Sequence, residues 1–101
     1  MLTKMEGMDL QPGYELEELG QTLLLKRPNG YVLAAFGKRV RPENIQRVAK
    51  ADEKYLRAVE RMDKFGLTAD SETVLMFSED VKEARTEFLL ALEVAYRGED
   101  A

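Results

Sequence analysis

The stretch LLLKRPNGYVLAAFGKRVRP, residues 23–42, decides the fold, because it contains two apolar runs joined by a tight-turn sequence. Asn29-Gly30 favours positive φ angles at two successive residues, which the commonest hairpin turns require, and Pro28 stiffens the approach to them. We therefore predict an antiparallel hairpin, with its two strands at residues 21–27 and 31–36.

The segment before the hairpin, YELEELG at residues 14–20, alternates apolar and acidic residues. That alternation is typical of a short edge strand with one solvated face. Gly20 leaves two alternatives: it ends this strand, or it bulges one long strand that continues to residue 27. Either alternative gives a two- or three-stranded antiparallel meander over residues 14–36. Residues 1–13 end in the turn sequence QPG, and we interpret them as a poorly ordered or loosely docked tail.

A long helix is predicted after the hairpin, at about residues 42–65. Pro42 is favoured in a first helical turn, where its missing N–H costs nothing, and Glu43 suits the positive end of the helix dipole. Asp52 interrupts the apolar stripe, and Gly66 is placed to cap the C-terminus. The stripe recurs at helical spacing: Ile45, Val48, Ala49, Tyr55, Leu56, Val59 and Met62.

A second helix is predicted at about residues 71–97, with Asp70 or Ser71 able to cap it and Gly98 ending it. Residues 74–77, VLMF, could instead form a fourth strand, and Ser78 could restart the helix after a kink. The apolar seam follows alternating steps of three and four residues: Val74, Phe77, Val81, Ala84, Phe88, Ala91 and Ala95.

The predicted fold class is α+β, in a single domain of 101 residues. A small antiparallel sheet of two or three strands (about 14–36) packs against an antiparallel two-helix hairpin (about 42–65 and 71–97). The packing is expected because each element alone would leave an apolar face exposed to water.

The composition excludes several kinds of chemistry. The chain has no Cys and no His, which removes disulfides, thiolate chemistry, cysteine zinc sites and the commonest general base. The sequence contains neither a phosphate-binding glycine loop nor a calcium-binding loop, and no apolar run approaches the ~18 residues of a membrane span. We therefore predict a cytoplasmic protein that is not an enzyme, with no catalytic residues, cofactor or bound metal.

Charge is segregated along the chain, although the net charge is only −4. Residues 26–50 hold seven bases and one acid, whereas the segments on both sides are acidic. The hairpin divides these bases into a tip pair, Lys26 and Arg27, and a second group some 15–20 Å away at about 3.3 Å per residue. We expect the tip pair to serve solubility. The predicted binding residues are the second group: Lys38, Arg39, Arg41, Arg47 and Lys50.

These features favour a small non-enzymatic protein-binding module. In style the chain resembles the small cysteine-free orphan proteins of bacteria, phages and mobile elements, many of which bind a larger host protein. That resemblance implies a possible phage or mobile-element inhibitor of a host defence protein, anti-CRISPR-like, acting by stoichiometric binding. The alternative is a nucleic-acid-binding accessory domain that uses the basic patch. The acidic face of the second helix could instead dock onto a basic partner, and the chain is expected to be a monomer or a homodimer.

Overall fold

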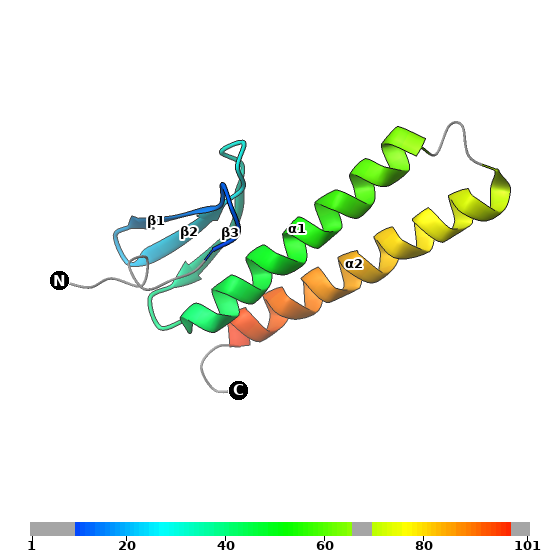
Figure 1. The fold of residues 1–101 in the computed structure, drawn as a ribbon. Coiled ribbons are helices and arrows are strands. Elements are labelled where there is room, and N and C mark those ends of the chain that lie inside the picture. Colours follow the sequence, from blue (N-terminus) through cyan, green and yellow to red (C-terminus); the bar gives the residue numbers. More distant parts are fainter. Residues whose placement is uncertain (1–9, 66–69, 98–101) are drawn as a thin grey trace.

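The computed structural model describes residues 10–65 and 70–97. Three strands, β1 (Glu15–Leu19), β2 (Thr22–Lys26) and β3 (Val32–Gly37), form one antiparallel sheet in the order β1-β2-β3. Two helices, α1 (Pro42–Phe65) and α2 (Ser71–Arg97), form an antiparallel hairpin beside it (Figure 1). The α+β prediction is confirmed, with three strands and not two.

Gly20 decides the strand count. It adopts a positive φ of 61°, so β1 ends at Leu19 and the chain returns at once, with Leu19 opposite Thr22. The alternative of one long bulged strand is therefore wrong. Residues 1–9 of the predicted tail lie outside the described residues. In the rest of it, Leu10 packs against the core, and Gln11 Nε2 donates a hydrogen bond of 2.9 Å to Glu53 Oε1.

The turn between β2 and β3 lies at residues 28–30 as predicted, but the expected positive φ at two successive residues is wrong. Gly30 alone has a positive φ, 89°, whereas Asn29 does not. Gly30 N donates to Arg27 O and Arg27 N donates to Tyr31 O, both at 2.8 Å, and Asn29 Oδ1 accepts from Tyr31 N at 2.9 Å. The turn is a three-residue loop closed by a left-handed glycine. The register shifts farther along the ladder, because Lys26 is opposite Val32 and Leu25 is opposite Ala34, which leaves Leu33 as an extra residue in β3.

α2 runs without interruption from Ser71 to Arg97, so both the strand at 74–77 and the kink at Ser78 are excluded. Asp70 caps it: Asp70 Oδ1 accepts a hydrogen bond of 2.8 Å from Thr73 N, which lowers the pKa of the carboxyl. The proposed glycine caps at residues 66 and 98 lie outside the described residues.

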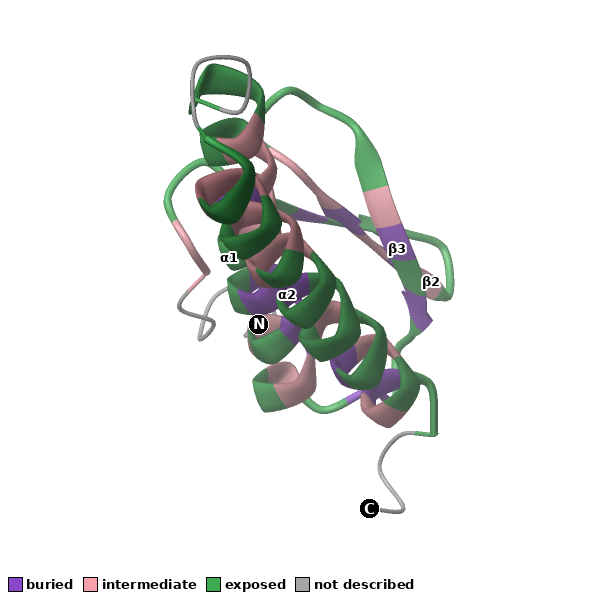
Figure 2. Cartoon of the chain, turned by 90° about the vertical axis from the view of Figure 1, so that its right-hand side faces the viewer, coloured by how far each residue is buried: buried purple, intermediate pink, exposed green. Residues whose placement is uncertain are grey.

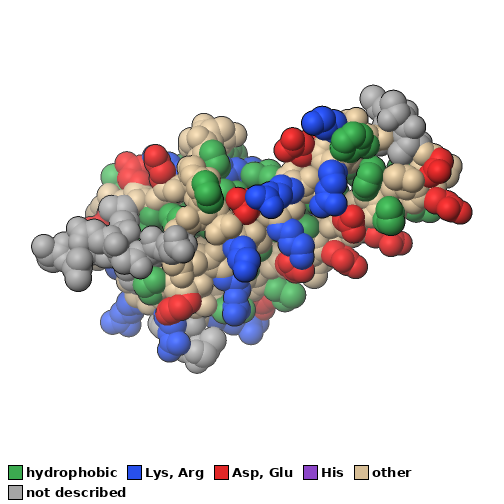
Figure 3. Space-filling model, in the orientation of Figure 1, with side chains coloured by type: hydrophobic (Ala, Val, Ile, Leu, Met, Phe, Trp, Pro, Cys, Tyr) green, Lys and Arg blue, Asp and Glu red, His purple; other side chains and the backbone are tan. Residues whose placement is uncertain are grey.

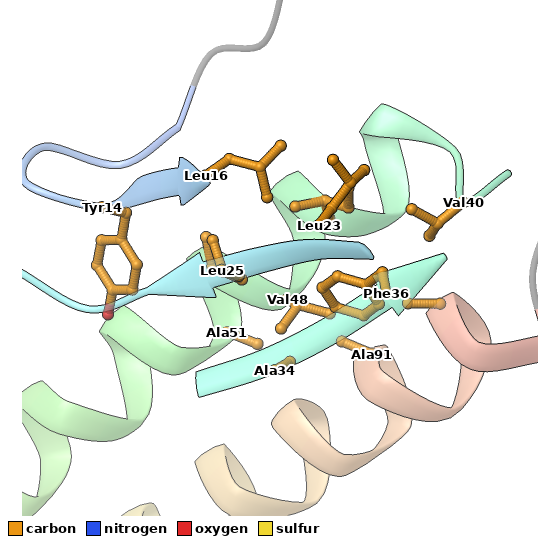
Figure 4. Close-up of a cluster of buried hydrophobic side chains, with 13 residues drawn as sticks. Tyr14, Leu16, Leu23, Leu25, Ala34, Phe36, Val40, Val48, Ala51 and Ala91 are labelled. Atoms are coloured by element: carbon orange, nitrogen blue, oxygen red, sulfur yellow. The ribbon is translucent and has the colours of Figure 1, made fainter. Parts of the chain in front are cut away.

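The core lies between the sheet and one end of the helical hairpin. Leu16, Leu23, Leu25 and Phe36 line the inner face of the sheet, and they lie between it and the two helices (Figure 4). The buried residues follow the strands and the helix faces turned toward them (Figure 2). The other end of the hairpin extends beyond the sheet, which gives the molecule its elongated dimensions of 54 × 27 × 18 Å (Figure 1).

The predicted seam of α2 is the α1-facing side, but its burial is uneven. Only its alanines are buried: Ala84, Ala91 and Ala95. The larger seam residues are partly exposed, because the sheet covers only the C-terminal half of α2. Small alanines let the two helices approach closely. No helix within 10–65 and 70–97 is both long enough and apolar enough to cross a bilayer.

Candidate functional site

A buried ionic cluster joins the sheet to α1. Asp52 is completely buried. Arg27, which follows β2, forms a bidentate ion pair with its carboxylate. Arg27 Nε donates to Oδ2 at 2.9 Å and Nη2 donates to Oδ1 at 2.7 Å. Tyr14 OH donates to the same Oδ2 at 2.7 Å. Both carboxylate oxygens are thus occupied, and this cluster connects elements and leaves no group directed at a ligand.

The pKa shifts in the cluster follow from its geometry. Burial raises the pKa of Tyr14 above its usual range, and the hydrogen bond to Asp52 raises it further. The same carboxylate raises the pKa of Arg27 by accepting its hydrogen bonds. The guanidinium also lies 5.0 Å from the centre of the Tyr31 ring.

The expectation that Arg27 serves solubility is therefore wrong. Its side chain is only 20% exposed, because it reaches back across the sheet to α1. Lys26, its neighbour, pairs with Glu17 across the β1–β2 ladder. One feature of the sequence indicated a buried partner: an aspartate that interrupts the apolar stripe of a helix is costly unless it is paired.

The five predicted binding residues do not form a single site in the structure. Lys38 pairs with Glu18 at 3.1 Å. Arg39, Arg47 and Lys50 are exposed, and none of these three makes an ion pair with another residue of the described ranges. Arg41 lies at the start of α1, where its carbonyl accepts from Asn44 N and Ile45 N at 3.0 and 3.2 Å.

Two of the predicted residues border a hollow of about 300 Å³ between the β3–α1 connection and the end of α2, which we call the sheet-side hollow. Phe36, Val40 and Ala95 are buried and form its floor. Tyr96 is 59% exposed, and its ring centre lies 5.4 Å from that of Phe36. The complete lining is Phe36, Gly37, Lys38, Arg39, Val40, Ala95 and Tyr96.

Two other predicted binding residues, Arg47 and Lys50, border a second hollow of about 300 Å³ between α1 and α2, which we call the interhelix hollow. Its lining is Arg47, Lys50, Ala51, Glu87, Leu90, Ala91 and Val94. Arg47 and Lys50 therefore do not share a site with Arg39, and Arg41 lines neither hollow.

A longer basic stripe runs along α1, and sequence reasoning identified only its first two members. It follows steps of three and four residues, the spacing that keeps side chains on one face of a helix. Figure 3 shows Lys and Arg side chains following this helix, with Asp and Glu gathered along the far half of α2. The stripe is Arg47, Lys50, Lys54, Arg57, Arg61 and Lys64.

The stripe lies on the side of α1 opposite the sheet. Asp52 marks the sheet-facing side, since it bonds Arg27 and Tyr14. Lys54 and Arg61 follow Asp52 by two and nine positions, which places them about 160–180° around the helix. Lys54 also bonds Glu87 of α2 at 2.9 Å, so the stripe borders the groove between the helices.

Comparisons with protein-family models, with curated proteins and with solved structures found no match to this chain. The site's own geometry therefore supplies the evidence for function. Among the residues that the structure describes, no group of three or more acidic side chains is arranged to hold a metal ion.

Proposed function

We propose that this chain is a small non-enzymatic protein-binding module and that the sheet-side hollow anchors its partner. One observation carries the proposal: Arg39 and Tyr96 stand at the rim of one hollow whose floor is apolar. Arginine and tyrosine are enriched among the residues that dominate protein–protein binding energy. Tyr96 is held by its contact with Phe36, so little conformational entropy is lost when a partner covers it.

The rim favours a partner of defined chemistry. Lys38 and Arg39 are cationic, and the floor of Phe36, Val40 and Ala95 is apolar. An apolar or aromatic side chain flanked by a carboxylate would satisfy both parts of the hollow. The hypothesis that this partner is a host defence protein, inhibited by stoichiometric binding in the manner of an anti-CRISPR, stays a prediction about its identity.

Affinity capture from a host lysate, followed by mass spectrometry, tests the proposal. Tagged wild-type chain is compared with Arg39→Glu and Tyr96→Ala, and with Lys82→Glu as a control that reverses an exposed charge on α2 away from the hollow. We expect a protein that is retained by the wild type and the control and lost with both hollow variants. Thermal melting of each variant verifies that it is folded. If no captured protein depends on Arg39 and Tyr96, the sheet-side hollow is not the anchor.

The basic stripe supports a second candidate, the nucleic-acid-binding accessory domain. Its six bases extend along about 25 Å of α1 at 1.5 Å per residue. Lys54 and Arg57 are already paired, with Glu87 and Glu53, which weakens the positive potential that a polyanion would meet. Fluorescence anisotropy with a short labelled DNA or RNA tests this candidate. Binding at low salt that weakens steeply as salt rises supports it, and its absence at low salt excludes it.

A further inference from the structure

The side of the helical hairpin opposite the sheet, which we call the back face, carries two parallel stripes of opposite charge. α1 contributes the basic stripe. α2 contributes an acidic stripe, Asp80, Glu83 and Glu87. Glu87 and Asp80 precede Tyr96 by nine and sixteen positions, which turns them about 160–180° away from the sheet-facing side that Tyr96 marks through Phe36.

Apolar residues mark the two ends of this face. Phe65 and Met76 lie at the end far from the sheet, where they are 47% and 55% exposed. Leu90, also 55% exposed, lies with Val94 beside the interhelix hollow at the other end. On α2 the back face is therefore apolar at both ends and acidic between them, whereas on α1 it is basic from Arg47 up to Phe65.

The pairing of Lys54 with Glu87 fixes which residues share a level along the hairpin. Because the helices are antiparallel and rise equally per residue, Arg61 is level with Asp80, and Phe65 is level with Met76. A two-fold rotation about an axis along the hairpin preserves these levels and places α1 of one copy over α2 of the other. In the middle of the face, Lys54 of each copy then lies over Glu87 of the other and Arg61 over Asp80. Phe65 lies over Met76 at the far end, whereas Arg47 and Lys50 lie over the apolar side chains beside the interhelix hollow.

We propose that the back face is the interface of a symmetric homodimer, with the two-fold axis parallel to the helical hairpin. The other two-fold arrangement of this face, with the axis across the hairpin, would place α1 over α1 and set bases against bases. Charge thus selects one symmetry, and the resulting contact is isologous and closes at two copies. The sheet-side hollow faces away from this interface, so the dimer leaves the proposed protein-binding site open and does not depend on it.

The size of the face fits a weak dimer. Residues 47–65 of α1 extend about 27 Å at 1.5 Å per residue, and two packed helices are about 20 Å wide. That footprint, roughly 540 Å² in projection, is near the low end of specific interfaces. Exposed ion pairs contribute little each and are screened by salt. We therefore expect association in the micromolar range that weakens as ionic strength rises.

Sedimentation velocity of the full chain, from about 1 to about 200 μM and at salt from about 0.05 to about 0.5 M, tests the dimer. We expect a reversible monomer–dimer equilibrium whose dissociation constant rises with salt. A monomer at every concentration in low salt overturns the proposal. Assemblies that grow beyond two copies also overturn it, because the two-fold contact closes.

A charge exchange between the helices tests which faces meet. One variant carries Arg57→Glu and Arg61→Glu, so in the middle of its back face both helices carry acids. The other carries Asp80→Lys and Glu83→Lys, so in the middle of its back face both helices carry bases. Each variant alone should be monomeric, whereas an equimolar mixture should form a heterodimer, because acidic α1 meets basic α2 and acidic α2 meets basic α1.

The mixing experiment distinguishes a changed interface from a misfolded variant, because a variant that had failed to fold would not form a dimer with its counterpart. Arg85→Glu is the matched control, because Arg85 is exposed and precedes Tyr96 by eleven positions, which places it about 20° around α2 from the sheet-facing side. It should dimerise as the wild type does. The back-face assignment fails if either double variant still dimerises alone, or if the mixture stays monomeric.

Discussion

Arg27 and Asp52 form a bidentate ion pair across the boundary between the sheet and α1, with donor–acceptor distances of 2.9 and 2.7 Å. Twenty-five positions separate them in the sequence. Asp52 is fully buried, so its charge depends on Arg27 and on the hydroxyl of Tyr14 for compensation. The pair fixes where the end of β2 sits on α1, and thereby how the sheet is oriented on the hairpin.

Removing one member of this pair should destabilise the fold strongly. Arg27→Met leaves a buried carboxylate with Tyr14 alone, and we expect a loss of about 3–5 kcal/mol in the free energy of unfolding. Asp52→Leu leaves a guanidinium that is 20% exposed, so water offsets part of the cost and the loss should be smaller. Urea denaturation of each variant measures both values.

The double variant Arg27→Met, Asp52→Leu provides the control. Well-packed apolar residues often replace a buried ion pair at little cost, so it should be more stable than Arg27→Met alone. If the free energy of unfolding lost in the double variant equals the sum of the losses in the two single variants, Arg27 and Asp52 are not energetically coupled.

Tyr14 should make the stability of this protein fall at alkaline pH. Its pKa is raised in the folded state by burial and by Asp52, so the folded protein holds the phenolic proton more tightly than the unfolded chain does. That contribution is complete below the unfolded pKa of about 10 and is lost as pH rises above it.

The measurement is the free energy of unfolding of wild type and Tyr14→Phe between about pH 8 and about pH 11. Tyr14→Phe should be less stable at pH 8, by about 1 kcal/mol for the lost hydrogen bond. The difference between the two proteins should shrink as pH rises past 10. Parallel pH profiles would show that Tyr14 does not titrate differently in the folded state.

Gly30 should tolerate alanine poorly although it has room for a side chain. A Cβ there would meet no atom within 4 Å, but φ is 89°, a conformation that L-residues rarely adopt. We expect Gly30→Ala to lose about 1 kcal/mol. Gly37 has equal space and no positive φ, so Gly37→Ala is the matched control and should be close to neutral. Thermal melting measures both variants. A loss at Gly30 alone indicates backbone strain, and equal losses at both positions would contradict that explanation.

The elements of this fold were predictable because their determinants are local. Pro28-Asn29-Gly30 specifies a reversal, and Pro42 begins a periodic helix. Gly20 left a reversal and a bulge as alternatives, and the positive φ that it adopts in the structure decides for the reversal. The geometry of the β2–β3 turn was not predicted, since Asn29 uses its side chain to bond Tyr31 N and leaves the positive φ to Gly30 alone.

The site residues were harder to predict, because they depend on how the elements pack. Whether Arg27 meets solvent or Asp52 depends on where the sheet rests on α1, and no local pattern encodes that position. The separation of Arg39 from Arg47 into two hollows has the same origin. The basic stripe, in contrast, could have been predicted, because the three- and four-residue spacing of its bases from Arg47 to Lys64 is visible in the sequence alone.

The close approach of the two helices should depend on the alanines of the α2 seam. Ala84 is 1% exposed, so a larger side chain there must push α1 away or adopt a strained rotamer. We expect Ala84→Leu to lose about 1–3 kcal/mol in the free energy of unfolding. Arg85→Leu places the same side chain one position along, on an exposed site, and should change stability by no more than about 0.5 kcal/mol. Urea denaturation of both variants gives the comparison, and equal losses would show that the seam is not closely packed at Ala84.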